Sequence, residues 1–510
     1  MATYDLNQPQ LNSLLANNVS LGTENAIIAA LKLAGEYPTG AQKIGVQTEV
    51  AGGPYTISTT DVTPSLPVRL FLDVGGSNSM TLTTSGHVVL AAGDGAVVSL
   101  SDVGPGGDTL VGGDGMDNLS VLAGNNLLIA GTGPSTLTGG SGVDTLIGGG
   151  HSVLNAGTGR ESLVGGLAAT AADTLTGSSG PDLLRVNHGN NLLEAGSGLN
   201  TLFGGTGADT LIGGGQSVLH AGTGDQTLRG GLAVGASDTL IGGSGADLLK
   251  VSHGHNLLEA GTGNNTLEGG GVAASRDTLI GGSGADLLRV SHGRNLLEGG
   301  SGHNTLDGGA GRDTLVGGGH SVLNAGTGHD LLEGGLKATA SDTLIGGTGA
   351  DRLVVSAGHN LLKAGSGNDT LQGGHSAASS DTLIGGSGAD ILQVFAGDNL
   401  LKAGSGDETL RGGAGRDTIF GGGTDTISVG AGNELIYGGS GTDRVNVGLT
   451  GNDTISGGAA TTVHTAQGEF AITSDKVVAG GATVITFSNG QVLDAKHVTI
   501  DFSGGGDKVV

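Results

Sequence analysis

Aspartate recurs at a fixed place in a glycine-rich hexamer, GGxGxD, and this spacing is the feature of the chain with the clearest chemical meaning. The intact hexamer ends at ten aspartates: Asp117, Asp144, Asp209, Asp247, Asp286, Asp313, Asp351, Asp390, Asp417 and Asp443. Regularly spaced carboxylates among flexible turns offer oxygen ligands, from side chains and main-chain carbonyls. Such ligands suit a hard cation, so we predict that these aspartates bind Ca²⁺.

Two aspartates in related hexamers complete the predicted metal ligands. Asp182 ends GSSGPD and Asp369 ends AGSGND. The alternative for every one of these aspartates is a turn residue that bonds its own backbone, as Asn also does. The chain has no Cys, which argues against zinc as the structural metal.

Other turns have an acid or amide at the same place without the preceding glycines. Asp173, Asp238, Asp277, Asp342 and Asp381 follow longer turns, and we expect them to cap those turns. Asn191, Asn256, Asn295 and Asn360 end turns such as VSHGHN, which we expect to close without metal. Asn265 and Asn304 end glycine-rich turns and would form weaker, uncharged sites.

The elements that must position these residues are short strands. After each hexamer comes x-L-x, a three-residue strand whose middle side chain points inward. Glycine allows the six-residue turn to adopt positive φ at low cost. Two nine-residue units make one coil, and stacked coils bury a ladder of Leu and Ile between two parallel sheets. The predicted fold class is therefore all-β, a parallel β-roll or β-solenoid.

Over about two thirds of its length the chain resembles the RTX family, the hemolysin-type calcium-binding nonapeptide repeats of proteins exported by type I secretion. The resemblance rests on the ten GGxGxD hexamers in register. It implies a β-roll in which the aspartates and nearby carbonyls bind several Ca²⁺ ions between turns. It also implies export, an extracellular location, and folding on meeting external calcium.

A longer repeat of 104 residues lies above the nine-residue one, since it separates Asp209 from Asp313 and Asp313 from Asp417. Successive turns fall on alternate edges of the roll if each unit reverses the chain once. The glycine-rich turns from Asp209 to Asn304 then share one edge. A block contains an odd number of turns, so from Asp313 the glycine-rich series moves to the other edge. We therefore predict that calcium lines one edge per block.

Composition suggests three regions. Residues 1–105 form an N-terminal cap, with a helix at about 24–34 that is N-capped by Thr23 and ended by Gly35 and Pro38, followed by strands such as RLFLDV and HVVLAA. Residues 106–458 form the solenoid. Residues 459–510 form a β-rich C-terminal cap that resembles the uncleaved secretion signal of RTX proteins.

Charge and motifs restrict the function. The net charge of −26 disfavours nucleic acid as a partner and favours cations. No apolar run is long enough for a membrane span. There is no GxSxG, HExxH or P-loop motif, so we expect no enzyme activity, and the 14 His are interpreted as solvated turn residues.

Outward strand positions have many aliphatic residues, including Leu183, Leu248, Ile345 and Ile384, which favours self-association. The alternative is that long turns fold over these side chains. We predict a secreted, calcium-stabilised structural solenoid at a bacterial surface, as a surface layer, matrix fibre or adhesin. Its partners would be calcium, copies of itself and a cell-surface glycan. The alternatives are an export and binding module for another protein and, third, an enzyme of unfamiliar type.

Overall fold

The computed structural model describes every residue except 1, 34–36, 40–41, 50–53, 58–67, 74–78, 83–87, 93–98, 103–105, 231–233, 336, 449–450, 466–471, 478–482, 488–491, 503–507 and 510. The chain divides into two compact units, Met1–Glu259 and Ala260–Val510. The strand β26 (Leu257–Thr262) spans the division.

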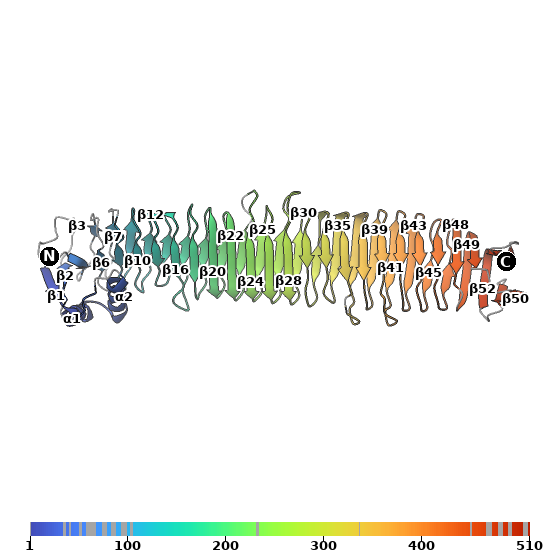
Figure 1. The fold of residues 1–510 in the computed structure, drawn as a ribbon, viewed down its shortest axis with the longest axis horizontal. Coiled ribbons are helices and arrows are strands. Elements are labelled where there is room, and N and C mark those ends of the chain that lie inside the picture. Colours follow the sequence, from blue (N-terminus) through green and yellow to red (C-terminus); the bar gives the residue numbers. More distant parts are fainter. Residues whose placement is uncertain are drawn as a thin grey trace. The chain divides into compact units, whose positions relative to one another are not determined.

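The first unit begins with β1 (Ala2–Leu6), α1 (Gln8–Asn18) and α2 (Leu21–Leu33) (Figure 1). The expectation of a single helix was wrong: Leu11, Leu14 and Leu15 give α1 one apolar face, but this pattern is short and lies among polar Asn, Gln and Ser residues. Asn7 caps α1: its side chain accepts a hydrogen bond from the Gln10 amide at 3.2 Å, and the Gln10 side chain accepts one from the Asn7 amide at 3.1 Å.

The predicted N-cap of α2 was also wrong. Thr23 lies inside the helix, and its amide donates to Oγ of Ser20 at 3.3 Å. Ser20 therefore takes the capping role, because it is the hydroxyl residue directly before Leu21. Of the two residues predicted to end the helix, Pro38 lies beyond Leu33, and Gly35 lies outside the described residues.

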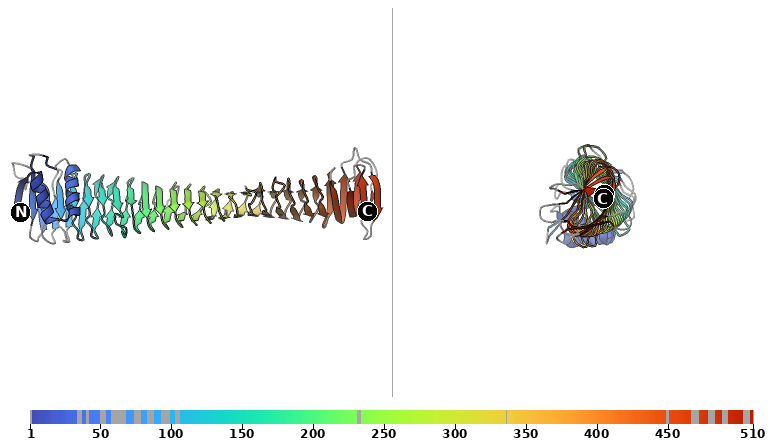
Figure 2. Two further views of the ribbon diagram at one scale, coloured as in Figure 1. Left: turned by 90° about the horizontal axis from the view of Figure 1, so that it is seen from below. Right: turned by 90° about the vertical axis from the view of Figure 1, so that its right-hand side faces the viewer.

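Both helices pack against the first strands of the unit (Figure 2). Leu11 and Leu15 of α1 and Ile27 and Leu31 of α2 are fully buried. They form one apolar cluster with strand residues that include Val46. The helices therefore cover apolar side chains at the start of the sheet.

Two parallel stacks of strands make up the rest of the first unit. The β8 stack contains β2 (Ile44–Glu49), β4 (Val68–Asp73), β6 (Val89–Ala92), β8 (Thr109–Val111), β10 (Leu127–Ile129), β13 (Thr145–Ile147), β16 (Ser162–Gly165), β18 (Leu183–Val186), β20 (Leu199–Thr206), β22 (Gln216–Thr223) and β24 (Thr239–Ser244). The β9 stack contains β3 (Pro54–Ile57), β5 (Ser79–Leu82), β7 (Ser99–Asp102), β9 (Asn118–Val121), β11 (Thr136–Thr138), β14 (Val153–Asn155), β17 (Thr174–Thr176), β19 (Leu192–Glu194), β21 (Thr210–Ile212), β23 (Thr227–Gly230) and β25 (Leu248–Val251). Parallel pairing thus begins before the glycine-rich repeats do. Turn residues add the small pair β12 (Ser141–Gly142) and β15 (Thr158–Gly159).

The second unit repeats this arrangement. The β28 stack contains β28 (Thr278–Ser283), β31 (Leu296–Glu298), β34 (Thr314–Val316), β36 (Leu331–Gly334), β38 (Arg352–Val355), β40 (Thr370–Gln372), β42 (Ile391–Gln393), β44 (Thr409–Arg411), β46 (Thr426–Ser428) and β48 (Thr442–Val447). The β27 stack contains β27 (Thr266–Gly269), β29 (Leu287–Val290), β32 (Thr305–Asp307), β35 (Val322–Gly328), β37 (Thr343–Gly349), β39 (Leu361–Ser366), β41 (Thr382–Ser387), β43 (Leu400–Ser405), β45 (Thr418–Phe420) and β47 (Leu435–Tyr437). Two short turn strands, β30 (His292–Gly293) and β33 (Ala310–Gly311), pair with each other.

The predicted inward ladder is confirmed. In the β27 stack Leu323 pairs with Leu344, which pairs with Leu362, and all three are fully buried. The residues on either side of each inward Leu are partly or fully exposed. The core of each unit is therefore a narrow column of aliphatic side chains between two stacks of strands.

The end of the second unit departs from the parallel pattern. β49 (Asn452–Thr465) pairs in parallel with β47, β48 and β52 (Val492–Phe502). Antiparallel pairs then join β50 (Ile472–Val477) to β51 (Thr483–Phe487), β51 to β52, and β52 to β53 (Lys508–Val509). The predicted β-rich C-terminal segment is confirmed. In the part of the chain that the structure describes, no helix has the length and apolar character to cross a membrane.

Candidate calcium sites

The sixth residue of each turn points into the protein, next to the inward Leu of the following strand. Asp209, Asp286 and Asp351 are 1%, 2% and 3% exposed. Each lies directly before a strand whose second residue is a fully buried Leu: Leu211, Leu288 and Leu353. The strand register therefore aims each carboxyl inward.

These sixth residues form two rows in each unit, because the amide that follows each one donates to the carbonyl of the row member one coil earlier. In the first unit the Asp144 row contains Asp108, Asn126, Asp144, Glu161, Asp182, Asn200 and Ser217, and continues through Asp238 and Asn256. The Asp209 row contains Asp117, Ser135, Ser152, Asp173, Asn191, Asp209, Gln226 and Asp247.

The second unit has the same two rows. The Asp286 row contains Asn265, Asp286, Asn304, Ser321, Asp342, Asn360, Asp381, Asn399, Asp417, Glu434 and Asp453. The Asp351 row contains Asp277, Asn295, Asp313, Asp330, Asp351, Asp369, Asp390, Glu408, Asp425 and Asp443.

The predicted alternation of turns between edges is confirmed inside the second unit. In the Asp286 row the turns that end at Asn265, Asp286 and Asn304 are rich in glycine, and the turns at the next members are short, long or of the VSAGHN type. In the Asp351 row the glycine-rich turns begin at Asp313. Whether calcium follows this change of edge stays a prediction.

In many Asp members of the rows, one carboxyl oxygen has the same role. Oδ1 of Asp351 accepts from the amide of Asp330 at 2.8 Å, and Oδ1 of Asp390 accepts from the amide of Asp369 at 2.8 Å. Asn serves equally well, since Oδ1 of Asn304 accepts from the amide of Asp286 at 2.9 Å. This oxygen ties neighbouring coils together without a metal.

The second oxygen separates two classes of turn. In most glycine-rich turns that end in Asp, Oδ2 is buried and has no hydrogen-bond partner. Among the described residues this holds for Asp209, Asp286, Asp313, Asp330, Asp351, Asp369 and Asp390. A buried oxygen without a donor is costly, and a cation removes that cost. These residues therefore fit a bound Ca²⁺.

In aspartates that follow the long turns, the second oxygen accepts a hydrogen bond from the backbone. Oδ2 of Asp342 accepts from the Gly335 amide at 2.5 Å, and Oδ2 of Asp381 accepts from the Gly374 amide at 2.7 Å. Asp173 and Asp277 accept in the same way, from Gly166 and Gly270. Their carboxyls hold the long turn closed with backbone donors alone, which supports their interpretation as turn caps.

The twelve predicted ligands thus all lie in the rows, but their second oxygens differ. Oδ2 accepts from the amide of its own turn in three of them: Asp144, Asp182 and Asp417. In Asp443 it accepts from Oγ1 of Thr461 at 3.3 Å. Asp117 and Asp247 are buried in the Asp209 row. Calcium binding by each of the twelve remains a prediction.

Sequence reasoning missed several acids of the same kind. Asp330 has an unpartnered Oδ2, and Glu161, Glu408 and Glu434 each have two buried oxygens without partners. Asp330, Glu161 and Glu408 end the turns AGTGHD, AGTGRE and AGSGDE. The signal that could have found them is the pattern AGxGx followed by any acid, because Ala replaces only the first glycine.

Burial raises the pKa of these acids. Desolvation raises the pKa of Asp209 to about 6 and that of Asp330 to about 7. Desolvation and the neighbouring carboxyl group of Asp425 raise the pKa of Glu408 to about 8. For Glu434 the same causes, with Asp453 as the neighbour, raise the pKa to about 9. No member of the rows is basic, as expected where a cation is the missing counter-charge.

Main-chain oxygen must supply much of any metal site here. Within the described ranges no three His, Cys, Asp or Glu side chains come together to hold a metal ion. Calcium takes six to eight oxygen ligands, including backbone carbonyls. Asp286, Asp313, Asp351, Asp369 and Asp390 would each give a carboxyl oxygen, and carbonyls of the glycine-rich turns would give the rest.

Comparison with known proteins agrees with this geometry. The family model of the RTX calcium-binding nonapeptide repeat consists of four copies of the repeat. It matches the chain in successive, partly overlapping segments that together cover residues 120–151, 168–217, 232–267, 273–319 and 339–461, more than half of the chain. A search of curated proteins finds no match. The repeat model, the parallel β-roll and the rows of inward carboxyls lead to one conclusion: the chain belongs to the RTX family of calcium-binding repeat proteins.

Proposed function

We propose that this chain is a secreted structural solenoid, stabilised by calcium, that assembles with further copies of itself at a bacterial surface. The calcium-binding β-solenoid follows from the family and the fold. Secretion, the surface location and assembly are the proposed part. The single observation that carries assembly is an outer strand face of the second unit with exposed apolar side chains.

This face, called the Phe420 face, is the outer side of the β27 stack. Its exposed apolar residues include Val322, Phe420 and Tyr437, which are 43%, 36% and 37% exposed. The rings of Phe420 and Tyr437 stack at 4.8 Å between centroids and 6° between planes. Ile345 and Ile384 occupy register positions of the same face.

A second copy is the partner that fits this face best. The chain has only eleven Phe and Tyr residues, so exposing a stacked pair on a regular strand surface favours an apolar contact. Lys363 and Lys402 alternate with the Ile residues, and the alternation repeats in the register of the stack. A copy of the same chain presents strands at a matching spacing.

Light scattering and electron microscopy of the full chain in calcium test assembly. We expect ordered fibres or sheets from the native chain. The variant Val322→Thr, Phe420→Ser, Tyr437→Ser should give dispersed particles. Ile391→Thr, on the β28 stack, is the control and should assemble normally. Dispersed particles from the native chain would instead favour the second candidate, a non-catalytic export and binding module for another protein.

A further inference from the structure

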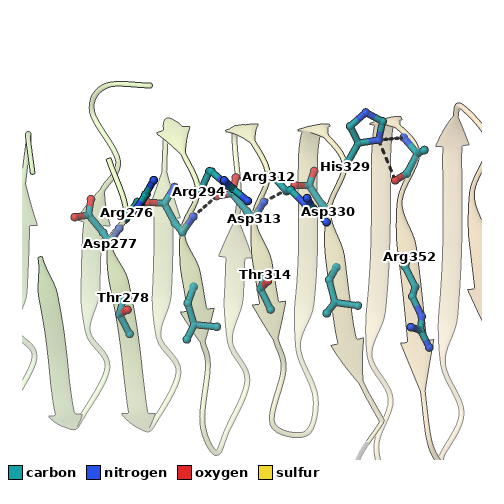
Figure 3. A pocket seen from close by; sticks show the side chains of 14 residues that line it. Arg276, Asp277, Thr278, Arg294, Arg312, Asp313, Thr314, His329, Asp330 and Arg352 are labelled. Atoms are coloured by element: carbon teal, nitrogen blue, oxygen red, sulfur yellow. Dashed lines mark hydrogen bonds between the residues drawn. The ribbon is translucent and has the colours of Figure 1, made fainter. Parts of the chain in front are cut away.

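A groove on the second unit has a row of basic side chains along one wall (Figure 3). Its volume is about 760 Å³. Arg276, Arg294, Arg312 and His329 form the wall, and each precedes a member of the Asp351 row in consecutive coils. They are exposed, and neighbouring coils are about 4.8 Å apart.

The three arginines have free guanidinium groups. No hydrogen bond or ion pair joins the side chain of Arg276, Arg294 or Arg312 to another residue in the described part of the chain. Their backbone amides are used, since Arg294 and Arg312 donate to carbonyls of the preceding coil at 3.0 and 3.1 Å. The fold therefore places these arginines side by side, and their guanidinium groups have no partner among the described residues.

The outer face of the β28 stack forms the floor of the groove. Thr278, Leu296, Thr314 and Leu331 alternate along it, and Arg352 lies at the end. Hydroxyl and aliphatic side chains therefore follow one another at the spacing of the strands. Figure 3 shows this floor beside the basic wall.

The basic wall is peculiar to one of the 104-residue blocks. At the positions of Arg276, Arg294, Arg312 and His329, the preceding block has Ala172, Asn190, Ala208 and Asp225, and the following block has Ser380, Asp398, Arg416 and Asn433. Where the residue is Asn or Asp, its side chain accepts the amide of the next coil, as Asn190 does from Ala208 at 2.9 Å and Asp398 does from Arg416 at 2.9 Å. The fold thus accepts neutral residues here, and three arginines are not needed to form the turns.

We propose that this groove binds a linear acidic polysaccharide that has a carboxylate or sulfate group on nearly every sugar. Guanidinium groups bind such oxyanions through paired hydrogen bonds. The alternating Thr and Leu floor offers hydroxyls to the sugar edges and apolar contact to the ring faces. This proposal names a ligand for the surface location proposed above and does not depend on self-assembly.

Two other polyanions fit less well. Single-stranded nucleic acid is bound through aromatic stacking platforms, but the groove has no Phe, Tyr or Trp, and the net charge is −26. A second copy would need a row of exposed carboxylates. At the turn position of the basic wall, carboxylates occur only at Asp225, Asp398 and Asp407, never in two consecutive coils of one row.

The test is fluorescence anisotropy of labelled oligosaccharides with the full chain in calcium. The probes are a short oligouronate, a sulfated oligosaccharide, a neutral glucan of the same length and oligothymidylate. The variant R276S/R294N/R312A uses, at each of the three positions, the residue found there in a neighbouring block: Ser380, Asn190 and Ala208. The matched control K337Q/R411Q/R416Q removes three positive charges from exposed positions of the second unit that lie outside the groove and outside the Phe420 face.

We expect the native chain to bind one or both acidic oligosaccharides, with the stronger of the two identifying the oxyanion. The R276S/R294N/R312A variant should lose at least about tenfold in affinity, and the control should change by less than about twofold. Circular dichroism checks that both variants fold. Unchanged binding in the arginine variant, equal loss in the control, or equal binding of the neutral glucan or oligothymidylate would overturn the proposal. The proposal would also be overturned if the native chain bound no saccharide and the arginine variant lost assembly. That result would assign the groove to a contact between copies.

Discussion

At the scale of the residue, the two oxygens of one carboxyl have different tasks. Oδ1 joins neighbouring coils, and Oδ2 is either used by a turn amide, as in Asp342, or left without a partner, as in Asp351. The same amino acid at the same point of the repeat can therefore act as a turn cap or as a metal ligand. What decides between them is whether the preceding turn brings an N–H to the second oxygen.

This difference predicts opposite effects of one substitution at two sites. Asp351→Asn keeps the Oδ1 acceptor, so it should lower the number of bound calcium ions by at least one per chain with little loss of stability without calcium. Asp342→Asn replaces one of two accepting oxygens by a donor, so it should destabilise the protein by about 1–3 kcal/mol and leave the ion count unchanged. Calorimetric calcium titration and thermal unfolding measure the two effects. Equal ion counts in both variants would contradict the assignment.

The raised pKa values predict how calcium-free protein responds to pH. In the folded chain Asp330 and Glu434 keep their protons up to about pH 7 and about pH 9, but their ordinary pKa values are 3.8 and 4.5. Between these limits the folded state binds more protons than the unfolded state, so stability falls as pH rises. Melting temperature in chelator should therefore drop by several degrees from about pH 5 to about pH 9. Saturating calcium should remove or reverse this trend, because the ion favours the ionised acids. A flat profile in chelator would contradict the burial of these acids.

At the scale of the element, each turn depends on glycine where two coils come close. Gly347 has φ of 98°, and a Cβ on it would collide with the carbonyl oxygen of Gly326 in the preceding coil. Turns that stack in this way cannot accept a side chain at this position. The strands restrict the residue type less than the turns do, since each x-L-x strand needs only one inward aliphatic residue.

Gly347→Ala should therefore destabilise the solenoid by at least about 1 kcal/mol, from the positive φ alone. Gly319→Ala is the matched control, because the nearest atom to its added Cβ is the Gly302 oxygen at 3.9 Å and its φ is not in the positive region. It should be neutral or slightly stabilising. Chemical denaturation in calcium compares the two variants. Equal effects would show that backbone approach does not limit the turns.

At the scale of the whole molecule, charge sets the conditions for folding. The chain has 47 acidic and 21 basic residues, and many of the acids are buried in the rows. Ions that bind only the folded state add to its stability by mass action. Calcium bound in the rows should therefore both offset their repulsion and favour the folded chain.

Calcium should raise the melting temperature in a concentration-dependent way. Magnesium at equal concentration should do less, because it demands a strict octahedral site that loosely built turns do not supply. Thermal unfolding by circular dichroism in chelator, magnesium and calcium checks this. Equal stabilisation by both ions would point to simple screening of charge.

The sequence by itself determined the fold class, the inward Leu ladder and the two-edge placement of the turns. These follow from a period of nine residues, since each unit has one strand and one turn and leaves almost no freedom of pairing. It did not determine the start of the helical region, where the helical spacing of Leu11, Leu14 and Leu15 in α1 covers little more than one turn and Ser20 caps α2 in place of Thr23.

Only the tertiary structure decided which carboxyl oxygens lack a donor. Asp342 and Asp351 are alike as aspartates that end turns, but Gly335 donates to the first from seven residues earlier. Asp330, Glu408 and Glu434 are further candidate ligands because the register of the coils buries their carboxyl oxygens without a partner. The basic groove likewise exists because stacking places Arg276, Arg294 and Arg312 side by side although they are 18 residues apart in the chain. Spacing along a sequence fixes which residues share an edge, but donors, burial and unpaired charge depend on contacts between coils.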